Sequence, residues 1–141
     1  MLEAVGYQYF DTYFEVCADL LKPHGIAFIQ TITIADQRYE KAKRSVDFIQ
    51  RYIFPGSCIP SLTALQNSIA ESSDLKIYHV EDIGDHYART LALWREAFFA
   101  HIKEVRALGF DDVFIRIWHF YLAYCEGGFK EKVISDIHLQ L

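Results

Sequence analysis

The sequence has no hydrophobic run near the roughly 20 residues that a helix needs to cross a bilayer, so no transmembrane segment is predicted. Cysteine is scarce and odd in number, with Cys17, Cys58 and Cys125 far apart. A disulfide framework is therefore not expected, and a reducing cytoplasm is the simpler location. The histidines show no spacing typical of a metal site, such as HxxxH, so no metal is predicted.

Positive charge is also in short supply. Lys and Arg number 14 against 19 Asp and Glu, which gives a formal net charge of −5. Proteins that bind nucleic acids usually carry a basic face, so the composition argues against a nucleic-acid partner. Hydrophobic residues make up 52% of the chain and supply ample material for a core. A length of 141 residues fits one domain, and we predict a single domain over 1–141.

Helical periodicity recurs along the chain. Apolar residues in 10–22 stand three and four positions apart, which predicts a one-sided helix that Pro23 and Gly25 end. Residues 110–129 are apolar or aromatic nearly all round, so we expect that helix to be deeply buried. Further helices are predicted at 37–53 and at 85–108. A short helix is also predicted after Ser61, which is a suitable N-cap.

Three segments read as strands. Residues 26–34, IAFIQTITI, are apolar or β-branched on both faces, which predicts a strand covered on both sides. Residues 133–141 alternate apolar and polar positions, which is typical of a strand with one wet face. A third strand is predicted at 75–83. This order of helices and strands indicates an α/β fold to which earlier strands belong. The polar positions of the last strand are Asp136, His138 and Gln140.

Several short stretches, taken in order, resemble those of one family. RYIFPGSCIPS resembles its I-F-P-G-G-x-L-P-S loop, and HYARTLALWREAF resembles H-Y-x-x-T-L-x-x-W. The chain is therefore similar to the C-terminal part of the cyclopropane-fatty-acyl-phospholipid synthases and the mycolic-acid cyclopropane synthases. The other matching stretches are MLEAVG, DTYFEVCADLLKPHG, IQTITI and YLAYCEGGF.

The resemblance implies an α/β fold, the C-terminal part of a Rossmann-like S-adenosylmethionine-dependent methyltransferase fold with its N-terminal strands missing. In this family a glycine-rich turn after the first strand and an acidic residue after the second hold most of the cofactor. Neither is found in this sequence. Met1 stands where the family has an internal methionine. We therefore expect 1–141 to be a single partial methyltransferase domain that is inactive by itself.

The reaction implied by the resemblance adds a methylene to a double bond of an unsaturated phospholipid acyl chain. The alkene attacks the methyl group of the sulfonium, and a base then removes a proton from the cationic intermediate so that the ring closes. In this family a bound bicarbonate is thought to be that base. By resemblance, the catalytic residues are Glu3, Gln30 and Tyr121, bicarbonate is held by Glu3, Gln30, Ile32 and Tyr121, and substrate contacts come from Phe54, Tyr87 and Trp94.

Each of these side chains also has an ordinary structural explanation. Glu3 alone reads as a solvated residue, and Tyr121 alone as a core aromatic whose hydroxyl is satisfied. Tyr121 and Cys125 share a helix face, where the thiol is better explained as a small buried group than as a nucleophile. Gln30 is a departure from the family, which usually has His there. A glutamine can orient an anion but cannot titrate, so a related fatty-acyl or other C-methylation remains open.

Two further interpretations concern partners. The segment 37–53 combines basic residues with Val, Phe, Ile and Tyr, a composition that suits an anionic membrane surface. Binding there would make the protein peripheral at the inner membrane. An ordinary helix with a solvated charged face is the favoured explanation. The alternative to an enzyme is a non-catalytic module that self-associates through an exposed sheet edge. A complete small fold that shares only ancestry with the family is a third possibility.

Overall fold

The computed structural model describes residues 2–141, and Met1 lies outside the described residues. The chain divides into two compact units. The sheet unit comprises residues 1–83 and 134–141, and the helical unit comprises residues 84–133. That these units act as one partial domain stays a prediction.

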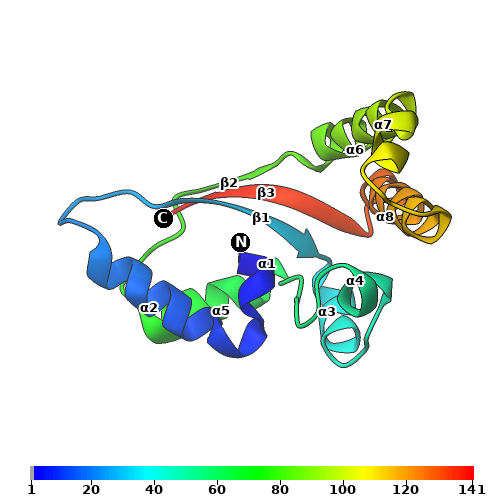
Figure 1. The fold of residues 1–141 in the computed structure, drawn as a ribbon. Helices are drawn as coiled ribbons and strands as arrows, with labels where there is room; N and C mark the ends of the chain where they lie inside the picture. Colours follow the sequence, from blue (N-terminus) through cyan, green and yellow to red (C-terminus); the bar gives the residue numbers. More distant parts are fainter. Residues whose placement is uncertain (1) are drawn as a thin grey trace. The chain divides into compact units, whose positions relative to one another are not determined.

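The sheet unit is built on three strands, and all three were predicted. They are β1 (Phe28–Ile34), β2 (His79–Asp82) and β3 (Ile134–Gln140). The strand order is β1-β3-β2, and both β1 and β2 pair antiparallel with the central β3 (Figure 1). The last strand of the chain therefore inserts between two strands that run parallel to each other. In the register, Gln30 lies opposite His138 and Ile32 opposite Asp136.

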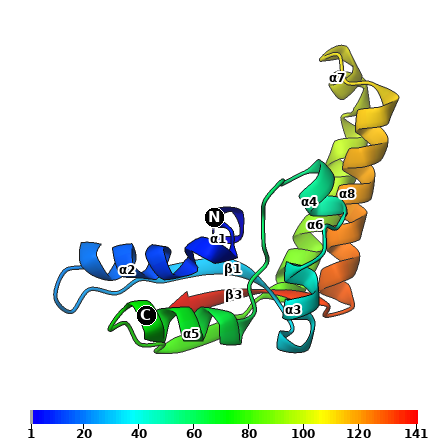
Figure 2. The ribbon, with the colours of Figure 1, turned by 90° about the horizontal axis from the view of Figure 1, so that it is seen from below.

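Helices of the sheet unit gather on one face of this sheet. The helices α2 (Phe10–Leu20) and α5 (Leu62–Ser72) lie side by side there (Figure 2). Both were predicted, because their apolar positions recur with helical period and Ser61 caps α5. The remaining helices of this unit are α1 (Leu2–Val5), the 3-10 helix η1 (Tyr7–Tyr9), α3 (Asp36–Lys43) and α4 (Phe48–Tyr52).

The core lies between this helical layer and the sheet. Phe14 of α2 and Leu65 of α5 are fully buried, and Ile29 of β1 packs with them. The opposite face of β1 is open, since Phe28 is 61% exposed. The expectation that both faces of β1 are covered is therefore wrong for the described chain. Alternation sends Ile29 and its odd-numbered neighbours into the helical layer and turns the even-numbered side chains away from it.

The predicted helix at 37–53 is interrupted. The helix α3 ends at Lys43 and α4 begins at Phe48. Asp47 starts the second helix, because its carboxylate accepts the Gln50 amide at 2.9 Å while the Gln50 side chain accepts the Asp47 amide at 3.0 Å. This reciprocal capping box begins a new helix at Phe48, which the apolar periodicity alone did not reveal.

Replacing Ser61 with Ala should destabilise the protein by about 1 kcal/mol. The buried Ser61 hydroxyl accepts the Ala64 amide at 3.2 Å, and without it that amide at the start of α5 loses its partner. Thermal and chemical denaturation followed by circular dichroism would measure the loss. Ser45→Ala is the control, since its exposed hydroxyl only donates to the Ala42 carbonyl. Equal effects of the two substitutions would contradict the capping role.

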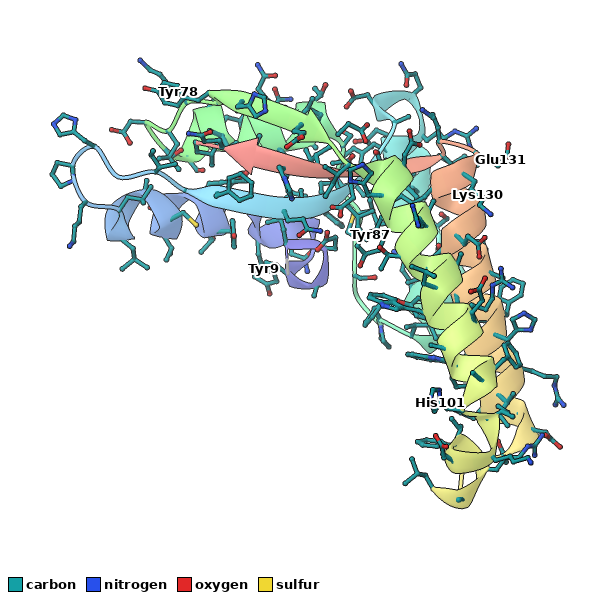
Figure 3. The ribbon with its side chains drawn as sticks, turned by 90° about the horizontal axis from the view of Figure 1, so that it is seen from above. Tyr9, Tyr78, Tyr87, His101, Lys130 and Glu131 are labelled. Atoms are coloured by element: carbon teal, nitrogen blue, oxygen red, sulfur yellow. The ribbon has the colours of Figure 1, made fainter. Side chains whose placement is uncertain are left out.

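The helical unit is a hairpin of α6 (Gly84–Ala100) and α8 (Asp112–Lys130), with the short α7 (Ile102–Ala107) between them. The predicted helix at 85–108 is split, since His101 lies outside helical geometry at the junction of α6 and α7 (Figure 3). Gly109 then turns the chain with a positive φ of 93°, a conformation that glycine adopts without strain.

Deep burial of the last helix was expected, and the structure corrects it. Ile115, Leu122 and Phe129 of α8 are buried, but Val113 and Phe120 are exposed. In this unit only α6 packs extensively against α8, so one stripe of the helix is covered rather than its whole circumference. No helix among residues 2–141 is long and apolar enough to cross a membrane.

Candidate active site

Glu3 lies at the outer edge of β1, carried there by α1. Its carboxylate oxygen Oε1 accepts the Ile32 amide at 2.5 Å and the Thr31 hydroxyl at 2.9 Å. These bonds join segments 28 positions apart in the sequence. The solvated alternative for Glu3 is therefore wrong, because the side chain is bound by the strand edge.

The same contacts determine the charge of Glu3. Burial by itself would raise the pKa of this carboxyl group. The amide of Ile32, the amide of Glu3 itself and the Thr31 hydroxyl outweigh that effect and hold the pKa below its ordinary value of 4.5. Glu3 is therefore a fixed negative charge at neutral pH.

The proline-containing loop that resembles the family motif runs along the same edge. The Cys58 amide donates to the Glu3 carbonyl at 2.8 Å, and the Ile34 amide donates to the Pro60 carbonyl at 2.9 Å. Inside the loop, the Gln50 side chain donates to the Ser57 carbonyl at 2.8 Å. Three motif stretches that are distant in sequence, those around Glu3, β1 and the loop, thus meet at one strand edge.

Gln30 forms a hydrogen bond with Asp136, a residue that the sequence did not indicate as part of the site. Its amide nitrogen Nε2 donates to Asp136 Oδ2 at 2.6 Å. Asp136 is only 1% exposed, and its second oxygen Oδ1 has no hydrogen-bond partner among the described residues. Asp136 was expected on the wet face of the last strand, so that prediction is wrong. It lies opposite Ile32, on the same sheet face as Gln30, where Gln30 covers it.

The pKa values of Asp136 and Glu3 are shifted in opposite directions. Burial raises the pKa of Asp136, and the charges of Glu3 and Asp82 raise it further. The Gln30 hydrogen bond and the charge of His138 oppose this increase but do not cancel it. A pair of neighbouring carboxyl groups with separated pKa values is typical of a site that handles charge or protons.

Gln30 does not lie toward the carboxyl end of its strand, where ligand sites of α/β folds usually form. It is the third residue of β1, in the first half of the strand. Its cross-strand partner is His138, whose ring lies 4.8 Å from Phe28. His138 Nδ1 in turn lies 3.5 Å from Glu81 Oε2 on β2. Polar side chains of all three strands therefore occupy this face.

Tyr121 belongs to the helical unit, on α8. Burial, followed by the nearby Cys125 and Tyr87, raises the pKa of Tyr121 to about 12, so the phenol stays protonated at neutral pH. Cys125 is half-buried and was correctly assigned to the same face as Tyr121. A common site of Tyr121 with Glu3 and Gln30 stays a prediction.

Aromatic side chains surround this part of the hairpin. The Tyr87 ring lies 5.0 Å from Phe129 and 6.1 Å from Trp94, and Figure 3 shows Tyr87 on α6. Trp94 is partly exposed, so its indole ring is available to an apolar ligand. Phe54, the third residue expected to contact substrate, belongs to the sheet unit and is 50% exposed. Their contacts with substrate stay predictions.

Glu126 was not identified as a functional or structural residue, yet it joins α6 and α8. Arg95 Nη2 lies 2.8 Å from its Oε2, and Lys130 Nζ lies 2.5 Å from its Oε1. The hydrogen bond from Lys130 lowers its pKa, and Arg95 adds to this against the cost of burial. The spacing of four residues between Glu126 and Lys130 was a usable signal for this pair.

Replacing Glu126 with Ala should destabilise the protein by about 2 kcal/mol, less than a fully buried ion pair, because Arg95 and Lys130 are partly exposed. Since the folded pKa is depressed, the contribution is present above the unfolded value near 4.5 and is lost as the pH falls through the folded value. Urea denaturation at neutral and acidic pH would measure both effects. Glu131→Ala, an exposed neighbour, is the control. A penalty that is equal at both pH values would refute the charge-based explanation.

Among the described residues, no cluster of three His, Cys, Asp or Glu side chains could hold a metal ion. The charged groups at the edge of β1 are carboxylates. The Ile32 amide and the Thr31 hydroxyl donate to Glu3 Oε1, and the Gln30 amide donates to Asp136 Oδ2. The carboxylates thus present negative charge. They are suited to stabilising a cation close by.

Comparison with solved structures defines the class of the fold. The chain matches the cyclopropane synthase MmaA2 of Mycobacterium tuberculosis with a TM-score of 0.86 and 25% identity, covering 98% of this chain and 51% of that one. It matches the mycolic acid cyclopropane synthase CmaA1, solved with SAH and CTAB, with a TM-score of 0.85 and 27% identity over the same shares. The predicted α/β fold, part of an S-adenosylmethionine-dependent methyltransferase fold, is thereby confirmed.

The family model described as mycolic acid cyclopropane synthetase matches residues 1–139, and the chain belongs to this family of S-adenosylmethionine-dependent methyltransferases. It is 41% identical over 135 residues to the tuberculostearic acid methyltransferase UfaA1 of Mycobacterium tuberculosis, covering 96% of this chain and 32% of that protein. It is 35% identical over 136 residues to the cyclopropane-fatty-acyl-phospholipid synthase of Escherichia coli, covering 96% and 34%. The chain thus spans about a third of the length of these curated relatives.

Proposed function

We propose that the protein to which these residues belong adds a methylene from S-adenosylmethionine to an unsaturated phospholipid acyl chain. The observation that supports this most is the carboxylate of Glu3, held ionised at the edge of β1 by Ile32 and Thr31. S-adenosylmethionine supplies an electrophilic methyl group when it is bound. Positive charge then develops on the acyl chain, and a fixed carboxylate and aromatic faces stabilise such charge where water is excluded.

Bicarbonate is proposed as the base, held by Glu3, Gln30, Ile32 and Tyr121. The Ile32 amide suits it, because in this structure this amide already donates to a carboxylate oxygen, Glu3 Oε1. The Gln30 carbonyl oxygen can accept the hydroxyl hydrogen of bicarbonate, since the nitrogen end of the Gln30 amide faces Asp136. When bicarbonate takes the Ile32 amide, the Thr31 hydroxyl and the amide of Glu3 itself still hold the Glu3 carboxylate. Depletion of bicarbonate from the assay should therefore lower turnover, and its return should restore it.

The alternative product is a methyl-branched acyl chain. Gln30 in place of the usual His favours considering it, as does the 41% identity to a protein named as a tuberculostearic acid methyltransferase. In that reaction the cation loses its proton from a different carbon, so the ring does not close. Incubating the full-length protein with S-adenosylmethionine and vesicles of unsaturated phospholipid separates the two outcomes. NMR of the product shows either cyclopropane ring protons or a branch, and no modified lipid at all contradicts both.

We propose that the 141 residues alone are inactive, because the glycine-rich turn and the acidic residue that hold most of the cofactor in this family are not in the sequence. Calorimetry of S-adenosylmethionine with this chain should show no tight binding. Micromolar affinity would contradict the proposal.

An anionic membrane surface is a further proposed partner. Basic residues of α3 lie near exposed aromatic rings, with Lys43 Nζ 4.3 Å from the centre of the Tyr7 ring, which suits an anionic phospholipid surface reached from the cytoplasm. Flotation with anionic and neutral vesicles would test it. Self-association through a sheet edge is the non-catalytic alternative, favoured by the exposed Phe28 at the start of β1 and the exposed Ile26 just before it. A monodisperse monomer in sedimentation would contradict it.

A further inference from the structure

The Asp136 side chain is an unusual group to retain in the sheet. It is almost completely buried, and within residues 2–141 its Oδ1 atom accepts no hydrogen bond. An unsatisfied buried acceptor destabilises a folded protein, and most native proteins avoid one. A hydrophobic residue at this position of β3 would pack without that cost. Stability therefore does not explain Asp136.

We propose that Asp136 is a positioning residue of the Glu3–Gln30 site, which fixes the orientation of the Gln30 side-chain amide. The inference rests on the proposed function and adds to it a residue outside the stretches that match the family motifs. Asp136 acts through Gln30.

The hydrogen bond between the two side chains carries this inference. An ionised carboxylate only accepts hydrogen bonds, so the nitrogen end of the Gln30 amide must face Asp136 Oδ2, at 2.6 Å. The carbonyl end of Gln30 must then face away from Asp136. Gln30 thus presents its carbonyl oxygen as an acceptor to a ligand, while its NH2 group is held by Asp136. Without Asp136 the amide could rotate and present either end.

The register of the sheet places this pair beside Glu3. Asp136 lies opposite Ile32, and the Ile32 amide is the group that binds the Glu3 carboxylate. Gln30 affects the pKa of Asp136 through its hydrogen bond. Charges that also affect this pKa come from Glu3 of α1, Asp82 of β2 and His138 of the same strand. Glu81 of β2 faces His138. Because of burial and these acidic neighbours, the pKa of Asp136 is raised, so Asp136 takes up a proton at a higher pH than an ordinary aspartate.

Protonation of Asp136 has a defined consequence for Gln30. A protonated carboxyl group can donate to the Gln30 carbonyl, and the amide is then free to rotate so that its nitrogen end faces the ligand. Activity should therefore fall as the pH is lowered through the pKa of Asp136. This fall should disappear when residue 136 can no longer titrate.

Two substitutions in the full-length protein separate the acceptor from the charge. Asp136→Asn keeps an oxygen acceptor for Gln30 and removes the titration. Asp136→Leu removes both. We expect Asp136→Leu to lower kcat by about 10- to 100-fold, with a melting temperature unchanged or higher, because an unpartnered buried oxygen is lost. The asparagine side chain would offer Gln30 both an acceptor and a donor, so Asp136→Asn should have a kcat between those of the wild type and Asp136→Leu, and should lose the acidic fall in the pH profile.

A double-mutant cycle tests whether Asp136 acts through Gln30. Gln30→Ala should lower kcat about as much as Asp136→Leu, and the double variant should be no worse than Gln30→Ala alone. Losses that multiply in the double variant overturn the proposal. Full activity of Asp136→Leu overturns it as well, and so does an Asp136→Asn variant as inactive as Asp136→Leu. The control is Asp19→Asn, which removes a carboxylate from an exposed position of α2 and should leave both kcat and the pH profile unchanged.

A measurement without turnover separates this inference from the proposed function. In NMR spectra of the full-length protein, the side-chain NH2 signals of Gln30 should shift with pH in the wild type and stay constant in Asp136→Asn. Signals that titrate equally in both proteins overturn the positioning role, even if the enzyme is active. A wild-type protein that modifies no lipid but shows the titration refutes the proposed function alone. If Asp136→Leu fails to fold, Asp136→Asn and these spectra decide the question.

Discussion

Replacing Glu3 with Gln is expected to lower the turnover of the full-length protein by about 10²- to 10³-fold. The substitution keeps the size of the side chain and an oxygen that can accept the Ile32 amide, so it removes mainly the charge. That charge is held close to the reacting acyl chain in the proposed mechanism. Turnover with unsaturated phospholipid vesicles, measured at saturating S-adenosylmethionine, gives the effect on kcat.

The matched control for this substitution is Glu15→Gln, which removes the same charge from an exposed position of α2 and should leave turnover unchanged. The pH dependence adds a second check. Because the pKa of Glu3 is held below 4.5, Glu3 remains ionised below that pH, and loss of activity above it must come from another group. Turnover of Glu3→Gln within about threefold of the wild type would remove Glu3 from the proposed mechanism.

Replacing Phe14 with Ala is expected to cost roughly 3–5 kcal/mol of folding free energy, the largest effect on stability that we predict. Phe14 is 0% exposed and packs in the core cluster with Leu65 and Ile29, where α2 and α5 meet the sheet. Truncation leaves a cavity that the surrounding sheet and helices cannot fill. Chemical denaturation followed by circular dichroism gives the change in free energy.

Leu20→Ala on the same helix is the matched control. Leu20 is 79% exposed, so its truncation removes little buried surface and should change the unfolding free energy by less than about 0.5 kcal/mol. A large effect of Leu20→Ala, or a small one of Phe14→Ala, would show that the helical layer packs differently from the structure. The core of the sheet unit also positions β1, so Phe14→Ala should weaken the Glu3 site indirectly.

Local sequence patterns correctly predicted the helices that bury a single apolar face. The helix at 10–22 and the helix after Ser61 were placed correctly, because each buries a single apolar stripe and has a stop or cap signal nearby. The helix at 37–53 was not, since the capping box of Asp47 and Gln50 breaks it in a stretch whose apolar period continues. Burial of 110–129 was overestimated, because composition cannot reveal how many neighbours a helix has.

The candidate site was predictable only in part. Glu3, Gln30 and Ile32 were named from their likeness to family motifs, and the structure brings their strand-edge contacts together. Asp136 was missed, because its alternation with apolar neighbours reads as a wet strand face. Its hydrogen bond to Gln30 spans 106 positions, and no local signal encodes a contact of that range.

The amino-acid sequence by itself determined which segments form helices and strands and to which family they belong, since both depend on residues close together in the chain. Only the tertiary structure decided which side chains meet. The antiparallel insertion of β3 beside β1 sets Asp136 next to Gln30, and the loop after α4 sets Cys58 against Glu3. Strand register and burial depend on contacts between distant segments, and these fix the charges of Glu3 and Asp136.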